Sequence, residues 1–211
     1  NNELRVYFQP LLGVESRKIV AVETLLRWVH PERGMIYPGE FIEHAEDSGL
    51  ISRLGDWVIR AALAEARRLP HDIRIAINIS PLQIHSTSLF STIVNALATN
   101  GIPSSRLELE ITESVLMADT NFTMERLHRL KELGVRIALD DFGTGYSSLS
   151  YLRAFPFDKI KIDKSFVSDL EYSEDSRAIT IATLNLAKSL GMSCTGEGVE
   201  TDFQQEFLAK N

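Results

Sequence analysis

Short runs of β-branched and other apolar residues alternate with segments of helical periodicity, and this alternation limits the possible folds of the chain more than any other feature. Seven apolar runs predict strands, at residues 6–8, 19–26, 73–79, 106–111, 135–139, 157–162 and 192–195. Between them, apolar residues recur every three or four positions, which predicts helices over 38–46, 54–69, 89–98, 119–133 and 178–190. Strands that alternate with helices are typical of βαβ units and a mainly parallel sheet.

The number of strands and the length of the chain narrow the choice of α/β fold. A (β/α)8 barrel has eight strands and runs to about 250 residues, whereas an open doubly wound sheet has about five or six strands. Seven strands in 211 residues therefore favour a barrel that lacks its last unit, with a doubly wound sheet as the alternative. No Pro-, Gly- or Ser-rich linker divides the chain, which predicts a single domain over residues 1–211.

Composition excludes several classes of function. Hydrophobic residues make up 44 % and charged residues 24 %, as in an ordinary soluble domain. The 22 basic and 29 acidic residues give a net charge of −7, which argues against a DNA or RNA polymer as partner. No apolar run reaches the roughly 18 residues that a membrane span needs, so we expect no membrane insertion of this domain. The single cysteine, Cys194, favours a reducing cytoplasm and is expected to be buried rather than nucleophilic.

Polar side chains lie at or just after the C-terminal ends of six predicted strands. In a barrel these ends meet at one mouth, where active sites lie. Any one of these residues alone is more typical of a helix cap or a solvated turn, but the whole set in register indicates a site. In chain order the residues are Glu23, Asn78, Glu110 with Glu113, Asp140 with Asp141, Lys161 with Asp163, and Glu197 with Glu200.

The chemistry of this set points to divalent cations and phosphorus. Carboxylates held together repel one another unless cations compensate, and oxygen ligands favour Mg²⁺ or Mn²⁺ over zinc. The adjacent Asp140 and Asp141 are able to hold two ions, an arrangement that serves in-line displacement at a phosphodiester. Lys161 would orient the attacking water or stabilise developing charge, although a simple salt bridge with one of the acids is the alternative.

Two weaker features lie near this set. The loop at residues 143–148 holds two glycines and is interpreted as a lid, a phosphate cradle or an ordinary connection between strand and helix. Four aromatic residues are candidates for stacking on a base, although the helical spacing of the second favours the core: Trp28, Trp57, Phe142 and Phe166.

Six sequence blocks, taken in order, resemble the signature of the EAL domain family. The resemblance covers essentially the whole chain from Tyr7-Phe8-Gln9-Pro10 onward, and six ordered blocks are far more specific than any one alone. The blocks are Glu23-Thr24-Leu25-Leu26-Arg27, Asn78-Ile79-Ser80, Glu110-Ile111-Thr112-Glu113, Asp140-Asp141-Phe142-Gly143-Thr144-Gly145, Lys161-Ile162-Asp163 and Glu197-Gly198-Val199-Glu200.

The resemblance implies a TIM-like (β/α)8 barrel with an antiparallel first strand, and an enzyme that hydrolyses cyclic di-GMP to linear pGpG. It implies two Mg²⁺ or Mn²⁺ ions per site, inhibition by Ca²⁺, and a homodimer coupled to catalysis through the loop at 142–148. The implied metal ligands are Glu23, Asn78, Glu110, Asp140 and Asp141. The implied catalytic residues are Lys161, Glu197 and Glu113, and the implied substrate-binding residues are Gln9, Leu26, Arg27, Asp163 and Glu200.

Two departures from the family pattern stand out. The naming triplet reads Glu-Thr-Leu at Glu23, which keeps the metal-binding glutamate. The sequence stops at Asn211, before the eighth strand of the family, so we expect an incomplete barrel, excised from a larger signalling protein whose own membrane anchoring stays open. The alternative to an enzyme is a catalytically silent cyclic di-GMP receptor, but such relatives usually lack several of the acids that this chain retains.

Overall fold

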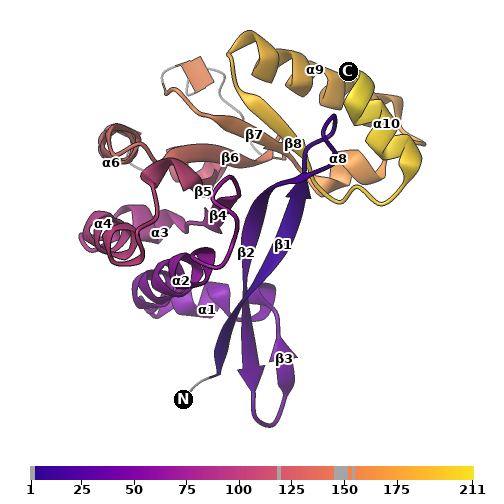
Figure 1. The fold of residues 1–211 in the computed structure, drawn as a ribbon. Coiled ribbons are helices and arrows are strands. Elements are labelled where there is room, and N and C mark those ends of the chain that lie inside the picture. Colours follow the sequence, from indigo (N-terminus) through magenta and orange to yellow (C-terminus); the bar gives the residue numbers. More distant parts are fainter. Residues whose placement is uncertain (1–2, 118–119, 145–151, 154) are drawn as a thin grey trace.

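Eight strands form one mixed sheet in the order β1-β2-β4-β5-β6-β7-β8, with β3 paired to β2 (Figure 1). The computed structural model describes residues 3–117, 120–144, 152–153 and 155–211. The strands are β1 (Leu4–Leu12), β2 (Ile19–His30), β3 (Gly34–Ile36), β4 (Arg74–Asn78), β5 (Leu107–Thr112), β6 (Arg136–Phe142), β7 (Lys159–Ile162) and β8 (Ser193–Gly196).

The direction of pairing confirms the TIM-like architecture. β1 runs antiparallel to β2, while the pairs from β2–β4 through β7–β8 are parallel. The strand order never reverses, as it does in a doubly wound sheet, so that alternative is wrong. Among the described residues β8 and β1 do not pair, and the barrel is therefore incomplete, as the strand count predicts.

Helices cover the outside of the sheet, and each predicted helical segment contains one. The residue expected to cap the 119–133 helix, Asp119, lies outside the described residues, whereas Gly101 ends α4 in the left-handed conformation, with φ 63°. None of the described helices is both long and apolar enough to cross a bilayer. The helices are η1 (Pro38–Glu40), α1 (Ile42–Asp47), α2 (Ile51–Ala66), α3 (Pro81–Ile84), α4 (Leu89–Asn100), η2 (Ser104–Arg106), α5 (Glu113–Met117), α6 (Thr120–Glu132), α8 (Lys164–Ser168), α9 (Glu174–Ser189) and α10 (Asp202–Lys210).

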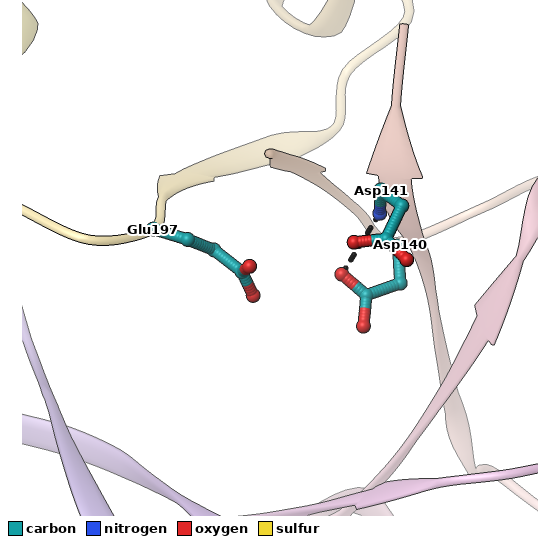
Figure 2. A group of neighbouring side chains, drawn as sticks. All are labelled: Asp140, Asp141 and Glu197. Carbon is teal, nitrogen blue, oxygen red and sulfur yellow. Dashed lines mark hydrogen bonds between the residues drawn. The ribbon is translucent and has the colours of Figure 1, made fainter. Parts of the chain in front are cut away.

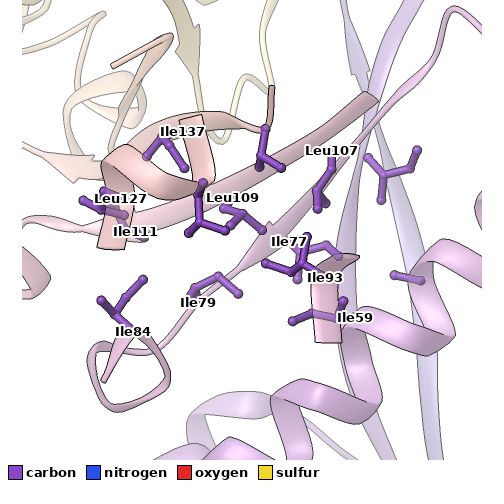
Figure 3. Close-up of a cluster of buried hydrophobic side chains, with 14 of the residues drawn as sticks. Ile59, Ile77, Ile79, Ile84, Ile93, Leu107, Leu109, Ile111, Leu127 and Ile137 are labelled. Atoms are coloured by element: carbon purple, nitrogen blue, oxygen red, sulfur yellow. The ribbon is translucent and has the colours of Figure 1, made fainter. Parts of the chain in front are cut away.

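The main hydrophobic core lies between the sheet and the helices α2, α4 and α6 (Figure 3). Ile59, Ile93 and Leu127 from these helices meet Ile77 and other outward-facing residues of the strands, all fully buried. Each such side chain contributes about 1.5–3 kcal/mol of hydrophobic stabilisation. Because side chains alternate along a strand, the residues between these apolar positions face the inside of the barrel, where the polar groups lie.

Alternation also places one predicted substrate-binding residue away from the site. Leu26 is 8 % exposed and lies in the core with Ile36 and Phe41, whereas Glu23, an odd number of positions away, faces the opposite side of β2. The Leu26 side chain therefore does not reach the barrel interior.

Two further expectations concern burial. Trp57, expected in the core, is 37 % exposed, so that expectation is wrong. Cys194 is half-buried and packs against both hydrophobic clusters.

Candidate metal centre

The ammonium group of Lys161 lies at the centre of the predicted set and meets four carboxylates. Its Nζ is 2.8 Å from Glu110 Oε2, 2.9 Å from Asp140 Oδ2 and 2.6 Å from Glu197 Oε1. A fourth carboxylate, Glu23, places Oε2 3.7 Å away, and Asn78 Nδ2 donates to Glu23 Oε1 at 2.9 Å. Five strands and the segment after β8 thus bring these predicted residues together. The salt-bridge alternative for Lys161 is present as part of the same group.

A β-bulge brings both aspartates of the Asp-Asp pair to this group. Leu139 pairs with Ile160 and Phe142 pairs with Ile162, so Asp140 and Asp141 together stand opposite the single residue Lys161. Asp141 adopts φ 53°, a left-handed conformation that few residues other than glycine accept, and its backbone N–H donates to Asp140 Oδ1 at 2.9 Å. Without the bulge, consecutive residues of a strand would point to opposite faces of the sheet.

Asp140, Asp141 and Glu197 form a group suited to hold a cation. Each offers one oxygen, and these oxygens all lie within 4.8 Å of one another. Figure 2 shows Glu197 reaching from the end of β8 toward the two aspartates on β6. All three donors are hard oxygen ligands of the kind that Mg²⁺ and Mn²⁺ prefer.

Burial and mutual repulsion shift the pKa values of these groups. Burial, followed by repulsion from Glu23 and Asp140, raises the pKa of Glu110 to about 8 although Lys161 opposes the shift. Burial is also the main cause that raises the pKa of Asp141 and of Glu197. Burial alone would lower the pKa of Lys161, but its carboxylate neighbours raise it above its ordinary value. Lys161 therefore remains a cation. Its single positive charge does not balance the negative charges of the carboxylates around it.

One buried oxygen of the group has no partner within the described residues. Glu110 Oε1 is buried and has no hydrogen-bond partner among the described residues, while Oε2 of the same carboxylate accepts from Lys161. A buried carboxylate oxygen without a partner is costly unless a cation occupies the space beside it. The residues present therefore fit a divalent metal.

Two further predicted residues, Glu113 and Asp163, hold segments that follow the strands β6 and β7. Glu113 Oε1 accepts from the backbone N–H of Gly143 at 3.2 Å, which ties α5 to the loop after β6. Asp163 caps α8 by accepting from Ser165, and these hydrogen bonds lower its pKa although burial opposes them. Residues 145–148 of the loop lie outside the described residues.

Three further predicted residues are accessible at the mouth. Gln9 of β1 pairs with Glu23 of β2 and shares its face of the sheet. Arg27 is half-buried on the same face, farther along β2, and Glu200 is exposed after β8. None of the three takes part in the ion pairs that Lys161 makes with the carboxylates among the described residues.

A second ion cluster, absent from our sequence-based expectations, lies one layer deeper in the barrel. Lys159 Nζ donates to Glu108 Oε1, and Arg136 Nε donates to Glu108 Oε2 at 3.2 Å. Glu108 is fully buried and Lys159 is 3 % exposed. The signal in the sequence was the spacing, because Glu108 and Lys159 stand two residues before Glu110 and Lys161 and therefore share their faces.

Comparison with known proteins identifies a family. The whole chain, residues 1–211, matches the EAL domain family. An uncharacterized signaling protein of Caulobacter vibrioides is 51 % identical over 208 residues, which cover 99 % of this chain and 26 % of that protein. The bifunctional diguanylate cyclase/cyclic di-GMP phosphodiesterase MucR of Pseudomonas aeruginosa is 40 % identical, over 99 % of this chain and 31 % of MucR.

Solved structures agree with the sequence relatives. The MucR phosphodiesterase in complex with c-di-GMP aligns with a TM-score of 0.93 at 40 % identity, over 99 % of this chain and 86 % of that one. A calcium/cyclic di-GMP complex of Klebsiella pneumoniae BlrP1 aligns with a TM-score of 0.85 at 28 % identity, over 99 % of this chain and 52 % of that one. This chain spans between 25 % and 31 % of the length of the first curated relatives that it matches.

Proposed function

This chain belongs to the EAL domain family, and we propose that its acidic mouth hydrolyses one phosphodiester bond of cyclic di-GMP to give linear pGpG. The observation that carries the proposal is the charge of the mouth: four carboxylates surround one ammonium, and a buried oxygen of Glu110 lacks a partner. A related phosphodiesterase that binds c-di-GMP shares this fold closely.

Two divalent ions, Mg²⁺ or Mn²⁺, fit the residues of the mouth. Glu23, Asn78, Glu110 and Asp140 would hold the first ion. Asp140, Asp141 and Glu197 would hold the second, because their oxygens converge. When bound, the ions would act as Lewis acids and lower the pKa of a bound water toward neutrality. We expect Ca²⁺ at the same ligands to inhibit.

The chain's own residues position the reactants and move the proton. Lys161 remains an ammonium because its pKa is raised, so it serves as a cation that orients the attacking water and not as a base. Glu197, whose pKa burial raises, is suited to accept the proton of that water at a carboxylate oxygen, while the leaving 3′ oxygen on the opposite side of the phosphorus takes a proton from solvent. Glu113 positions the loop after β6 through the N–H of Gly143.

The residues at the rim of the mouth would hold the rest of the substrate. Arg27 suits a phosphate or a guanine edge because its guanidinium donates two hydrogen bonds in one plane. We assign the same role of lining the substrate to Gln9, Asp163 and Glu200, and a role through its backbone to Leu26. The homodimer and the cytoplasmic location stay predictions that accompany this proposal.

Chromatographic product analysis with Mg²⁺ tests the proposal. Wild-type protein should convert cyclic di-GMP to pGpG, and Glu23→Gln should lower turnover about a thousand-fold and weaken Mg²⁺ binding measured by calorimetry. Glu65→Gln is the matched control, since Glu65 pairs only with Arg68 on the surface of α2 among the described ion pairs.

Two outcomes would contradict the proposal. Equal turnover in Glu23→Gln and wild type would remove Glu23 from the metal ligands. Tight binding of cyclic di-GMP by wild-type protein without any product would identify the chain as a receptor and not an enzyme.

A further inference from the structure

The strands β1, β2 and β3 form a wall that extends beyond the metal centre. One face of β2 carries Glu23, Leu25 and Arg27 in alternate positions. Cross-strand pairing with β1 places Gln9, Tyr7 and Arg5 beside them on that face. Outward from the metal centre, the wall thus presents an amide with an acid, then Tyr7 with Leu25, then two arginines.

Tyr37 completes the outermost row. Trp28 of β2 pairs with Ile36 of β3 in antiparallel direction. Arg27, which precedes Trp28, therefore stands opposite Tyr37, which follows Ile36. The guanidinium carbon of Arg27 lies over the Tyr37 ring, 4.9 Å from its centroid, and Arg27 Nη1 donates to its neighbouring carbonyl, Leu26 O, at 2.7 Å. Arg27 is thereby fixed by two contacts, while Tyr37 remains 56 % exposed.

The other aromatic candidates do not offer a free ring at this wall. Trp28 donates its Nε1 to Glu3 and packs edge-on against Phe41. Phe142 is 8 % exposed, and Phe166 packs in the smaller hydrophobic cluster. Two aromatic side chains among the described residues of these strands combine exposure with a position on the face of Glu23: Tyr7, which is 46 % exposed, and Tyr37. Of the two, Tyr37 is the one whose ring is held by the guanidinium of Arg27.

We propose that Tyr37, backed by Arg27, forms the binding surface for a guanine base of the substrate and sets the affinity for it. This inference rests on the proposed function. Four residues along β2 from Glu23 to Arg27 span about 13 Å, a reach comparable to that from a reacting phosphate to the far edge of a base. The tyrosine ring supplies a stacking face for the base, and the guanidinium of Arg27 against the other side of the ring holds that face in place.

Steady-state kinetics on two substrates test this role. Tyr37→Leu should raise KM for cyclic di-GMP about tenfold and leave kcat within about twofold, because stacking is lost while the metal centre is unchanged. The same variant should hydrolyse bis(p-nitrophenyl) phosphate, a phosphodiester without a purine, as wild type does. Tyr37→Phe should restore the KM for cyclic di-GMP, since it keeps the ring.

Tyr172→Leu is the matched control, because Tyr172 is 87 % exposed on the turn between α8 and α9. An unchanged KM in Tyr37→Leu, or an equal loss on both phosphodiesters, would overturn the role in binding a base. If wild-type protein hydrolyses neither compound, the proposed function fails, and calorimetric titration with cyclic di-GMP then decides the role of Tyr37: weaker binding by Tyr37→Leu supports it, and equal binding overturns it.

Discussion

Lys159 and Lys161 lie on the same face of β7, and each bonds a glutamate of β5, yet the two layers differ in charge. In the deeper layer Glu108 receives Lys159 and Arg136, and Arg136 also reaches Asp158, which pairs with Lys131, so two acids meet three cations. In the layer at the mouth, Lys161 alone meets four carboxylates. The deeper layer satisfies its charges within the chain, whereas the mouth keeps a surplus of negative charge.

This difference separates a structural ion pair from a functional one built of the same residue types. A buried carboxylate with two cationic partners has no need of a further ligand, and its main effect is on stability. Four carboxylates around one ammonium are stable together only if protons or metal ions neutralise them. Charge balance, more than the presence of a Glu–Lys pair, therefore marks the mouth as the site.

Removing one acid from each layer should break the comparison most clearly. Glu110→Gln is expected to lower hydrolysis about a thousand-fold, because it deletes a proposed metal ligand. Glu108→Gln is expected to leave turnover within a few-fold but to destabilise the protein by about 3 kcal/mol, because Lys159 loses its buried counter-charge. Initial rates with Mg²⁺ and denaturant unfolding without metal measure the two effects. A folded but inactive Glu108→Gln protein would place the deeper layer in the reaction.

The pH dependence of stability should sharpen the contrast at the mouth. Burial raises the pKa of Glu110 from 4.5 to about 8, so between these values the folded state holds a proton that the unfolded state releases. Without metal, stability should therefore decrease as pH rises from about 4.5 to about 8, by several kcal/mol, since each unit of the pKa shift corresponds to about 1.4 kcal/mol. Thermal unfolding across this range measures the decrease, and Glu110→Gln should flatten the profile.

Metal should reverse this trend. Mg²⁺ at about 100 times its Kd should stabilise the protein by about 2.7 kcal/mol, and more at pH 8 than at pH 5 because a ligating carboxylate must lose its proton. Stabilisation by Mg²⁺ that does not depend on pH would argue against Glu110 as a ligand.

The smallest effect is expected on the opposite face of β2. Thr24 is 4 % exposed, and its hydroxyl oxygen has no hydrogen-bond partner among the described residues. Thr24→Val keeps the shape and removes the unsatisfied hydroxyl, so the free energy of unfolding should rise by about 1 kcal/mol while kcat stays unchanged. Denaturant unfolding measures the gain. A loss of hydrolysis would show that the face of β2 opposite Glu23 also affects the mouth.

Much of the fold and of the site could be predicted from this sequence because both depend on local alternation. Apolar runs give the strands, and parallel strands bring their C-terminal ends together, which groups Asn78, Glu110 and Asp140 without any knowledge of contacts. The same alternation could have excluded the Leu26 side chain, which stands an odd number of positions from Glu23.

Other features depend on pairing between strands that a single sequence does not display. β3 has only three residues and exists through its pairing with β2. The partners of Glu108 come from β6 and β7, 28 and 51 residues away, so the spacing shows a shared face but not the balance of charge. The β-bulge at Asp140 and Asp141 carries neither glycine nor proline to mark it.

That bulge makes the number of residues in β6 as important as their identity. Two aspartates stand opposite one lysine because β6 holds one residue more than its partner strand at this point. Deleting a single residue between Leu139 and Phe142 would restore an even register and remove one carboxylate from the group, with every other side chain retained. Substitution scans would not detect this dependence, whereas insertions and deletions in β6 would reveal it at once.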